Sequence, residues 1–159
     1  MKALVVYDSL YGNTEKIAQA IAGVLKSQAE VSILRVGDVK PQHLARLSLL
    51  VAGTPTHGGR ASQATNAWLK TLPAGCLRGV KVTAFDTRVP VPEVTPRIFA
   101  NLARLFGYNA APRVADALVK LGGTLVLPAE GFAVKDTKGP LLDGELERAA
   151  AWAQQVVKV

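Results

Sequence analysis

The chain has 159 residues, of which 49% are hydrophobic and 19% are charged, and its formal net charge is +7 at pH 7. Such a chain is long enough to bury a core as one domain, and its composition excludes an intrinsically disordered or collagen-like protein. No apolar run reaches the roughly 18 residues of a membrane helix, and Asp8 closes the apolar start too early for a secretory leader. We therefore expect a cytoplasmic protein without a membrane segment.

The predicted elements alternate along the chain between short apolar strands and helices with one apolar face. We expect strands at residues 3–7, 31–36, 49–52, 80–85 and 124–127, the last interrupted by Pro128, and helices at about 17–25, 41–47, 62–72, 112–121 and 143–157. The first strand is apolar at every position, as in a strand that is covered on both faces. The alternation predicts an α/β fold in which helices cover a five-stranded parallel sheet.

A Pro-rich segment at residues 89–96 delays this alternation after the fourth strand, and an amphipathic stretch from Ile98 to Phe106 follows it. We expect an inserted, Pro-rich and helical segment at about residues 89–105, on the surface of a single domain that spans residues 1–159. The apolar side of the stretch suits either packing on its own domain or contact with a second protein, and the sequence leaves both open.

The charged residues argue against a nucleic-acid partner, because the basic residues are spread evenly and are not interleaved with aromatic ones. The net positive charge still suits an anionic ligand or an acidic protein. Cys76 has no second cysteine for a disulfide and no neighbouring His for a zinc site, so we expect no structural metal.

The loop after the first strand is the first candidate site, since ligands of open parallel sheets bind beyond the carboxyl ends of the strands. This loop, residues 9–14, reads SLYGNT and leads directly into the first helix. Unpaired amides at the helix start, the hydroxyl groups of Ser9 and Thr14, and the close approach that Gly12 permits would together bind a phosphate. The loop has no lysine, which disfavours an ATP-binding P-loop, and an ordinary capped turn is the alternative.

This loop resembles the phosphate-binding loop of the flavodoxin family. The loop after the third strand, residues 53–59 with the sequence GTPTHGG, resembles the segment that lies along the flavin in that family. The strand end at 84–88 and the tail at 139–147 extend the resemblance over nearly the whole chain outside the insertion. The resemblance implies a flavodoxin-like three-layer sandwich with strand order 2-1-3-4-5, FMN as the cofactor, and electron transfer as the function.

The resemblance also implies which residues contact the cofactor. They are Ser9, Leu10, Tyr11, Gly12, Asn13, Thr14, Thr54, Pro55, Thr56, His57, Gly58, Gly59, Asp86, Thr87, Arg88 and Tyr108. His57 stands where many flavodoxins have a Trp against the flavin, so we expect weaker stacking there, a proton-donating role, or an ordinary loop histidine. Arg88 would favour negative charge on the reduced flavin, unless it pairs with Asp86 or Asp86 caps a helix. Tyr108 is the candidate for the outer face of the ring, or it packs the insertion onto the domain.

Other functions of similar folds are less compatible with the sequence. A phospho-acceptor receiver domain is excluded, because Asp8 has no acidic neighbour and the third strand ends in Gly53 rather than Asp. A hydrolase is disfavoured by the absence of a nucleophile elbow. Three functions remain: an FMN-dependent electron carrier that docks on an acidic redox partner, which we favour; an NAD(P)H-linked quinone-type oxidoreductase; and a flavin-free binding or regulatory module. No residue is assigned a catalytic role, and no oligomeric state is predicted.

Overall fold

The computed structural model describes residues 1–90, 97–98 and 109–159. Most of the insertion predicted at 89–105 therefore lies outside the described residues, and so does Tyr108. The helices and strands follow one another in the order β1 (Lys2–Tyr7), α1 (Asn13–Leu25), β2 (Glu30–Arg35), a 3-10 turn (Val36–Asp38), α2 (Pro41–Leu44), β3 (Leu49–His57), β4 (Arg60–Ala61), α3 (Gln63–Thr71), β5 (Lys81–Arg88), α5 (Ala110–Lys120), β6 (Thr124–Leu125), β7 (Glu130–Ala133) and α6 (Glu145–Lys158).

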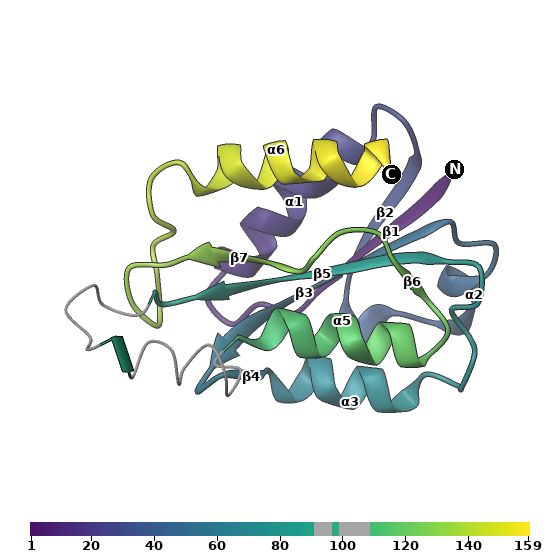
Figure 1. The fold of residues 1–159 in the computed structure, drawn as a ribbon, viewed down its shortest axis with the longest axis horizontal. Helices are drawn as coiled ribbons and strands as arrows, with labels where there is room; N and C mark the ends of the chain where they lie inside the picture. Colours follow the sequence, from purple (N-terminus) through teal and green to yellow (C-terminus); the bar gives the residue numbers. More distant parts are fainter. Residues whose placement is uncertain (91–96, 99–108) are drawn as a thin grey trace.

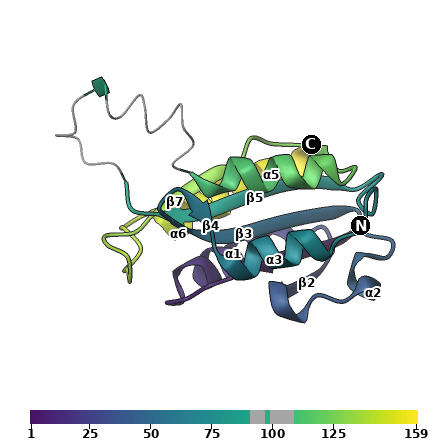
Figure 2. The ribbon, with the colours of Figure 1, turned by 90° about the horizontal axis from the view of Figure 1, so that it is seen from below.

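The strands form one sheet in the order β2-β1-β3-β5-β6, and these neighbours all run parallel. Val5 in β1, for example, lies opposite Ile33 in β2 and Val51 in β3. Two short strands add to this order: β7 pairs parallel with the end of β5, and β4 pairs antiparallel with the end of β3. Helices α1 and α6 cover one face of the sheet, and α3 and α5 cover the other (Figures 1 and 2). The predicted three-layer fold and its strand order are confirmed.

The boundary expected for the third strand was wrong, whereas the predicted interruption of the fifth strand at Pro128 is confirmed. The third strand does not end at Ala52 but continues to His57, since its last residues pair with β4 in a hairpin. The fifth strand is broken around Pro128 into β6 and β7, because proline cannot donate a ladder hydrogen bond. Ser62 caps α3 as expected, and its hydroxyl accepts the Thr65 amide at 3.2 Å.

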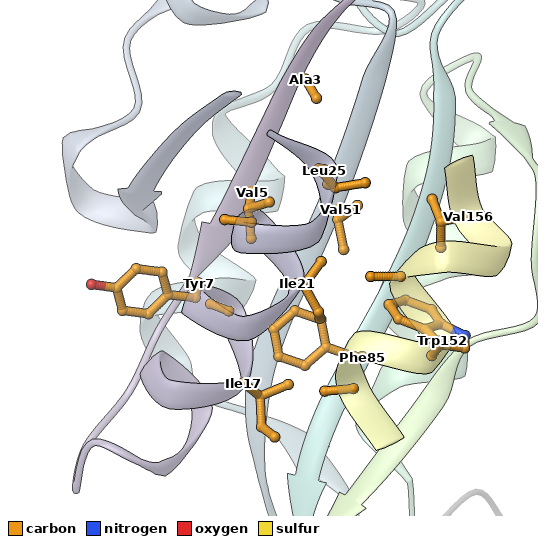
Figure 3. Packing of buried hydrophobic residues seen from close by; sticks show 14 of the residues in the cluster. Ala3, Val5, Tyr7, Ile17, Ile21, Leu25, Val51, Phe85, Trp152 and Val156 are labelled. Atoms are coloured by element: carbon orange, nitrogen blue, oxygen red, sulfur yellow. The ribbon is translucent and has the colours of Figure 1, made fainter. Parts of the chain in front are cut away.

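The core lies on both faces of the sheet, because successive residues of the buried strands point to opposite sides. On the side of α1 and α6, Phe85, Phe132 and Trp152 meet edge to face, with ring centroids 6.1–6.5 Å apart. Figure 3 shows Phe85 and Trp152 between the sheet and these helices. Gly53 must be a glycine here, because a Cβ atom would overlap the Phe85 ring. In the described part of the chain, no helix combines the length and apolar character needed to span a bilayer.

Candidate functional site

The candidate site lies at the edge of the sheet where the parallel strands end. The loops that follow β1, β3, β5 and β7 all leave the sheet at this edge (Figure 1). The loop after β1, the turn after β3 with the strand end before it, and the end of β5 contain the predicted residues that the structure describes, and the loop after β7 reaches the first loop from the far end of the chain.

The loop after β1 holds unpaired backbone donors at the start of α1. Gly12 is the N-cap of the helix and adopts a left-handed conformation with φ 89°, which favours glycine, while its amide donates to the Ser9 hydroxyl at 3.0 Å. Among the described residues, no acceptor is hydrogen-bonded to the backbone amides of Leu10, Tyr11, Asn13 or Thr14. Together with the positive end of the helix dipole, these donors can bind an anion.

A cluster of polar side chains holds this loop on its outer side. The Arg35 guanidinium donates to the Ser9 carbonyl at 3.1 Å and lies 3.5 Å from the Glu15 carboxylate. The Tyr7 hydroxyl donates to the same carboxylate at 3.0 Å, and burial together with this hydrogen bond raises the pKa of Tyr7. Since Glu15 is paired in this way, its negative charge opposes anion binding at the helix start less than an unpaired carboxylate would.

On the buried side of the loop, side-chain hydroxyl groups form hydrogen bonds within the protein. The hydroxyl groups of Thr14 and Thr87 lie 2.7 Å apart and join α1 to the end of β5. Both residues are buried, so the Thr14 hydroxyl, which was expected to contact a ligand, also holds the loop against the sheet. The Ser9 hydroxyl accepts one hydrogen bond and still has its own proton to donate.

The loop after β3 is a tight hairpin. Gly58 and Gly59 have φ values of 55° and 76°, as a two-residue type I′ turn requires, and they connect His57 in β3 to Arg60 in β4. His57 and Arg60 are both exposed, so the hairpin presents an imidazole and a guanidinium side by side at this edge.

The threonines of the same segment face inward. Thr54 is fully buried, and its hydroxyl accepts the Ser62 amide and the Thr65 hydroxyl, each at 3.1 Å. The Thr56 hydroxyl accepts the Ala110 amide at 3.2 Å and so caps α5. The side chains of Thr54 and Thr56 thus support two helices, and His57 is the exposed side chain at the end of β3.

The end of β5 carries a buried ion pair. The fully buried Asp86 accepts from Arg88 Nε at 2.6 Å with one carboxylate oxygen and from the Ala111 amide at 2.9 Å with the other. The guanidinium also covers Gly131, where a Cβ atom would overlap it. Both alternatives left open by the sequence therefore hold: Asp86 pairs with Arg88 and caps α5.

The loop after β7 is the part of the site that the sequence did not predict. Asn13 Nδ2 donates to the Lys138 carbonyl at 3.1 Å, and Lys138 Nζ lies 6.0 Å from the centre of the Tyr11 ring. Gly139 permits this approach, because a Cβ atom there would lie 2.6 Å from the side-chain nitrogen Nδ2 of Asn13. The sequence of the first loop alone gives no sign of this lysine.

The structure thus brings together most of the predicted residues at one edge of the sheet. The first loop, the hairpin and the strand end contribute all of them except Tyr108, which lies outside the described residues. Within residues 1–90, 97–98 and 109–159, no group of three His, Cys, Asp or Glu side chains is arranged to hold a metal ion.

A comparison of the sequence with models of known protein families finds a match. A family model described as flavodoxin matches residues 5–86, just over half of the chain, and this range includes the first loop, the hairpin and Asp86. The chain belongs to the flavodoxin family.

Two curated proteins and a solved structure are also similar to this chain. An NAD(P)H dehydrogenase (quinone) of Gluconacetobacter diazotrophicus is 34% identical in a match that covers 44% of this chain and 46% of that protein. A protein of the same name from Cupriavidus metallidurans is 32% identical, over 50% of each chain. The chain spans about half the length of the curated relatives it matches. The solved structure of oxidised flavodoxin 1 from Bacillus cereus has a TM-score of 0.76 at 19% identity and covers 99% of this chain and 98% of its own, which supports the fold alone.

Proposed function

We propose that this protein binds FMN at the carboxyl edge of its sheet and serves in electron transfer. The observation that carries the proposal is the loop of residues 9–14, where Gly12 turns the chain and four backbone amides, two before Gly12 and two in the first turn of α1, have no partner among the described residues. A phosphate monoester offers acceptor oxygens and negative charge, and this loop offers donors and the positive end of a helix.

The residues present fit the phosphate end of FMN. The Thr14–Thr87 hydroxyl pair ties the loop to the end of β5, and Arg35 binds the Ser9 carbonyl. The free amides of the loop are therefore held in place before a ligand binds. A site that is preorganised in this way loses less conformational entropy when it binds a ligand. The backbone amides and the Ser9 hydroxyl would bind the phosphate, while Thr14 and Asn13 position the loop.

The hairpin and the end of β5 would border the flavin ring. When bound, the isoalloxazine ring accepts and donates the electrons, and the protein contributes binding, orientation and electrostatics. Arg88 is neutralised by Asp86 at 2.6 Å, so its effect on negative charge at the ring would be smaller than an unpaired cation would have. His57 is exposed at the hairpin tip and would offer its imidazole as a hydrogen-bond donor or as a small stacking surface.

For the partner, we propose an acidic redox protein. Arg60, Lys135 and Lys138 are exposed on the loops of this edge, and the whole chain carries a net charge of +7. Complementary charge steers association, so the rate of electron transfer to an acidic protein should fall steeply with ionic strength. A basic partner of similar potential should react slowly at low salt and faster as salt is added.

A second candidate function comes from the names of the curated relatives, which are NAD(P)H dehydrogenases (quinone). In this case the FMN-loaded protein would oxidise NAD(P)H continuously in the presence of a soluble quinone, at a rate that depends little on salt. Fast transfer to the acidic protein without such turnover would favour the carrier.

The first experiment is an anaerobic titration of the folded protein with FMN, followed by absorbance and fluorescence, with riboflavin in parallel. We expect saturable binding of FMN and weaker binding of riboflavin, which lacks the phosphate. No binding of FMN by protein with a native circular dichroism spectrum would reject the proposal and favour the flavin-free module.

A further inference from the structure

The loop after β7 is a short, hydrogen-bonded hairpin rather than an irregular connection. A β-bridge between Val134 and Leu141, with backbone hydrogen bonds on either side of it, joins the two arms of the segment 133–142. At the tip, the Gly139 amide donates to the Asp136 carbonyl at 2.9 Å, and the Asp136 carboxylate accepts the Lys138 amide at 3.0 Å. These bonds define the turn that carries Lys138, so the position of its backbone is set by the fold.

The tip of this hairpin rests on the first loop, from which it is separated by 125 residues in the sequence. The Lys138 carbonyl accepts from Asn13 Nδ2 at 3.1 Å, and Asn13 is itself buried at the start of α1. The side chain of Lys138 extends over the neighbouring Tyr11, with the ammonium 6.0 Å from the ring centre. The Lys138 backbone is therefore fixed against the first loop, and its ammonium lies over the side chain of Tyr11, one of the residues whose backbone amides are proposed to bind phosphate.

The charge of this ammonium is not neutralised locally. Among the ion pairs of the described residues, none includes Lys138, and the nearest acid along the chain, Asp136, turns its carboxylate to the backbone of the hairpin. The contact with the exposed Tyr11 ring is weak, since cation–π contacts at exposed sites contribute little. A flexible four-carbon stem allows the ammonium to leave the ring when an anion is near.

From this juxtaposition we propose that Lys138 is a ligand-binding and specificity-determining residue, whose ammonium pairs with the phosphate that the first-loop amides bind. The inference rests on the proposed function and extends it. It makes the site selective for phosphate monoesters, because an unphosphorylated flavin would gain nothing from the lysine. The lysine also makes the affinity for FMN depend more strongly on salt than it would if backbone donors alone bound the phosphate.

The test compares FMN and riboflavin binding in three variants. Lys138→Met removes the charge and retains the bulk, Lys138→Arg retains the charge, and Lys135→Met removes another exposed cation from the segment 133–142. At low ionic strength we expect Lys138→Met to weaken FMN binding about tenfold and to leave riboflavin binding unchanged. The FMN affinities of Lys138→Arg and Lys135→Met should remain within about twofold of the wild-type affinity. The loss of FMN affinity in Lys138→Met should become smaller as salt is added.

Two results would overturn the inference. The first is FMN affinity in Lys138→Met equal to that of Lys135→Met. The second is a loss that is the same for FMN and riboflavin, since the lysine would then act through the loop or the ring and not through the phosphate. Native circular dichroism spectra and unfolding midpoints of the variants show whether the exposed substitutions leave the fold intact.

Inorganic phosphate serves as a second probe, which separates this inference from the proposed function. If the wild type binds phosphate but no FMN, the proposed function fails, and weaker phosphate binding in Lys138→Met than in Lys135→Met still supports the role of the lysine. If the wild type binds FMN and Lys138→Met binds it equally well, the proposed function stands and the inference fails. If the wild type binds neither probe, both fail.

Discussion

Replacing Asp86 by Ala should destabilise the fold far more than it weakens cofactor binding. Asp86 is fully buried, and both of its carboxylate oxygens are used: one accepts from Arg88 Nε at 2.6 Å and the other from the Ala111 amide at 2.9 Å. The alanine variant would leave the Arg88 guanidinium unpaired and the Ala111 amide at the start of α5 without its acceptor.

The magnitude follows from these two losses. Removing one partner of a buried ion pair costs about 3–5 kcal/mol, and the lower end applies here because the Arg88 side chain is 24% exposed. A lost helix cap costs about 1 kcal/mol. We therefore expect Asp86→Ala to lower the free energy of unfolding by about 3–4 kcal/mol. Asp86→Asn retains an acceptor for Ala111 but loses the charge, so about 1–2 kcal/mol is expected.

The assay is urea unfolding followed by far-ultraviolet circular dichroism, without FMN, because a ligand that binds the folded state would add its own stabilisation. Asp116→Ala, a substitution at an exposed position of α5, the helix that Asp86 caps, is the control and should stay within about 0.5 kcal/mol of the wild type. If Asp86→Ala unfolds like the control while its affinity for FMN falls tenfold, Asp86 contacts the cofactor and does not support the fold.

Two further predictions concern the backbone and the pH dependence of stability. Gly12→Ala should lower the free energy of unfolding by about 1 kcal/mol, because φ is 89° at this position. Gly23→Ala should raise it by about 0.5–1 kcal/mol, because Gly23 lies on the exposed face of α1 and the added methyl group would meet open space. Urea unfolding of the two variants checks this, and equal effects of the same sign would contradict it. The hydrogen bond from Arg148 lowers the pKa of Glu145, and the Ala133 amide adds to this lowering, against the effect of burial. A carboxyl group whose pKa is lowered in the folded state stabilises the fold above its unfolded pKa, near 4.5, and loses this contribution as the pH falls toward the folded pKa. Between about pH 5 and pH 3 the wild type should thus lose more stability than Glu145→Gln, and parallel curves would count against the assignment.

Much of the fold could be predicted because its elements follow local patterns. The apolar runs of β1 and β3 and the spacing of apolar residues in α1 are typical of a sheet covered on both faces. The extension of β3 to His57 was missed because residues 53–57 are polar or small and do not continue the apolar run. Gly58-Gly59 is a typical hairpin turn and could have indicated that a strand continues up to it.

The site was predicted less completely, because a sequence gives the type of a side chain but not its direction. Thr14, Thr54 and Thr56 were expected to contact the cofactor, and the sequence did not show that their hydroxyl groups also bond to other parts of the protein. The approach of Lys138 to Asn13 depends on the packing of a hairpin 125 residues away, which no local motif encodes.

The most direct test of the phosphate-binding role of the first loop is a proton–nitrogen NMR titration of the labelled protein with FMN and, separately, with riboflavin. The account predicts that the backbone amide protons of Leu10, Tyr11, Asn13 and Thr14 shift downfield with FMN, as donors to phosphate oxygens do, and respond little to riboflavin. Binding of FMN that leaves these four amides unchanged, or that shifts them equally with riboflavin, would contradict it.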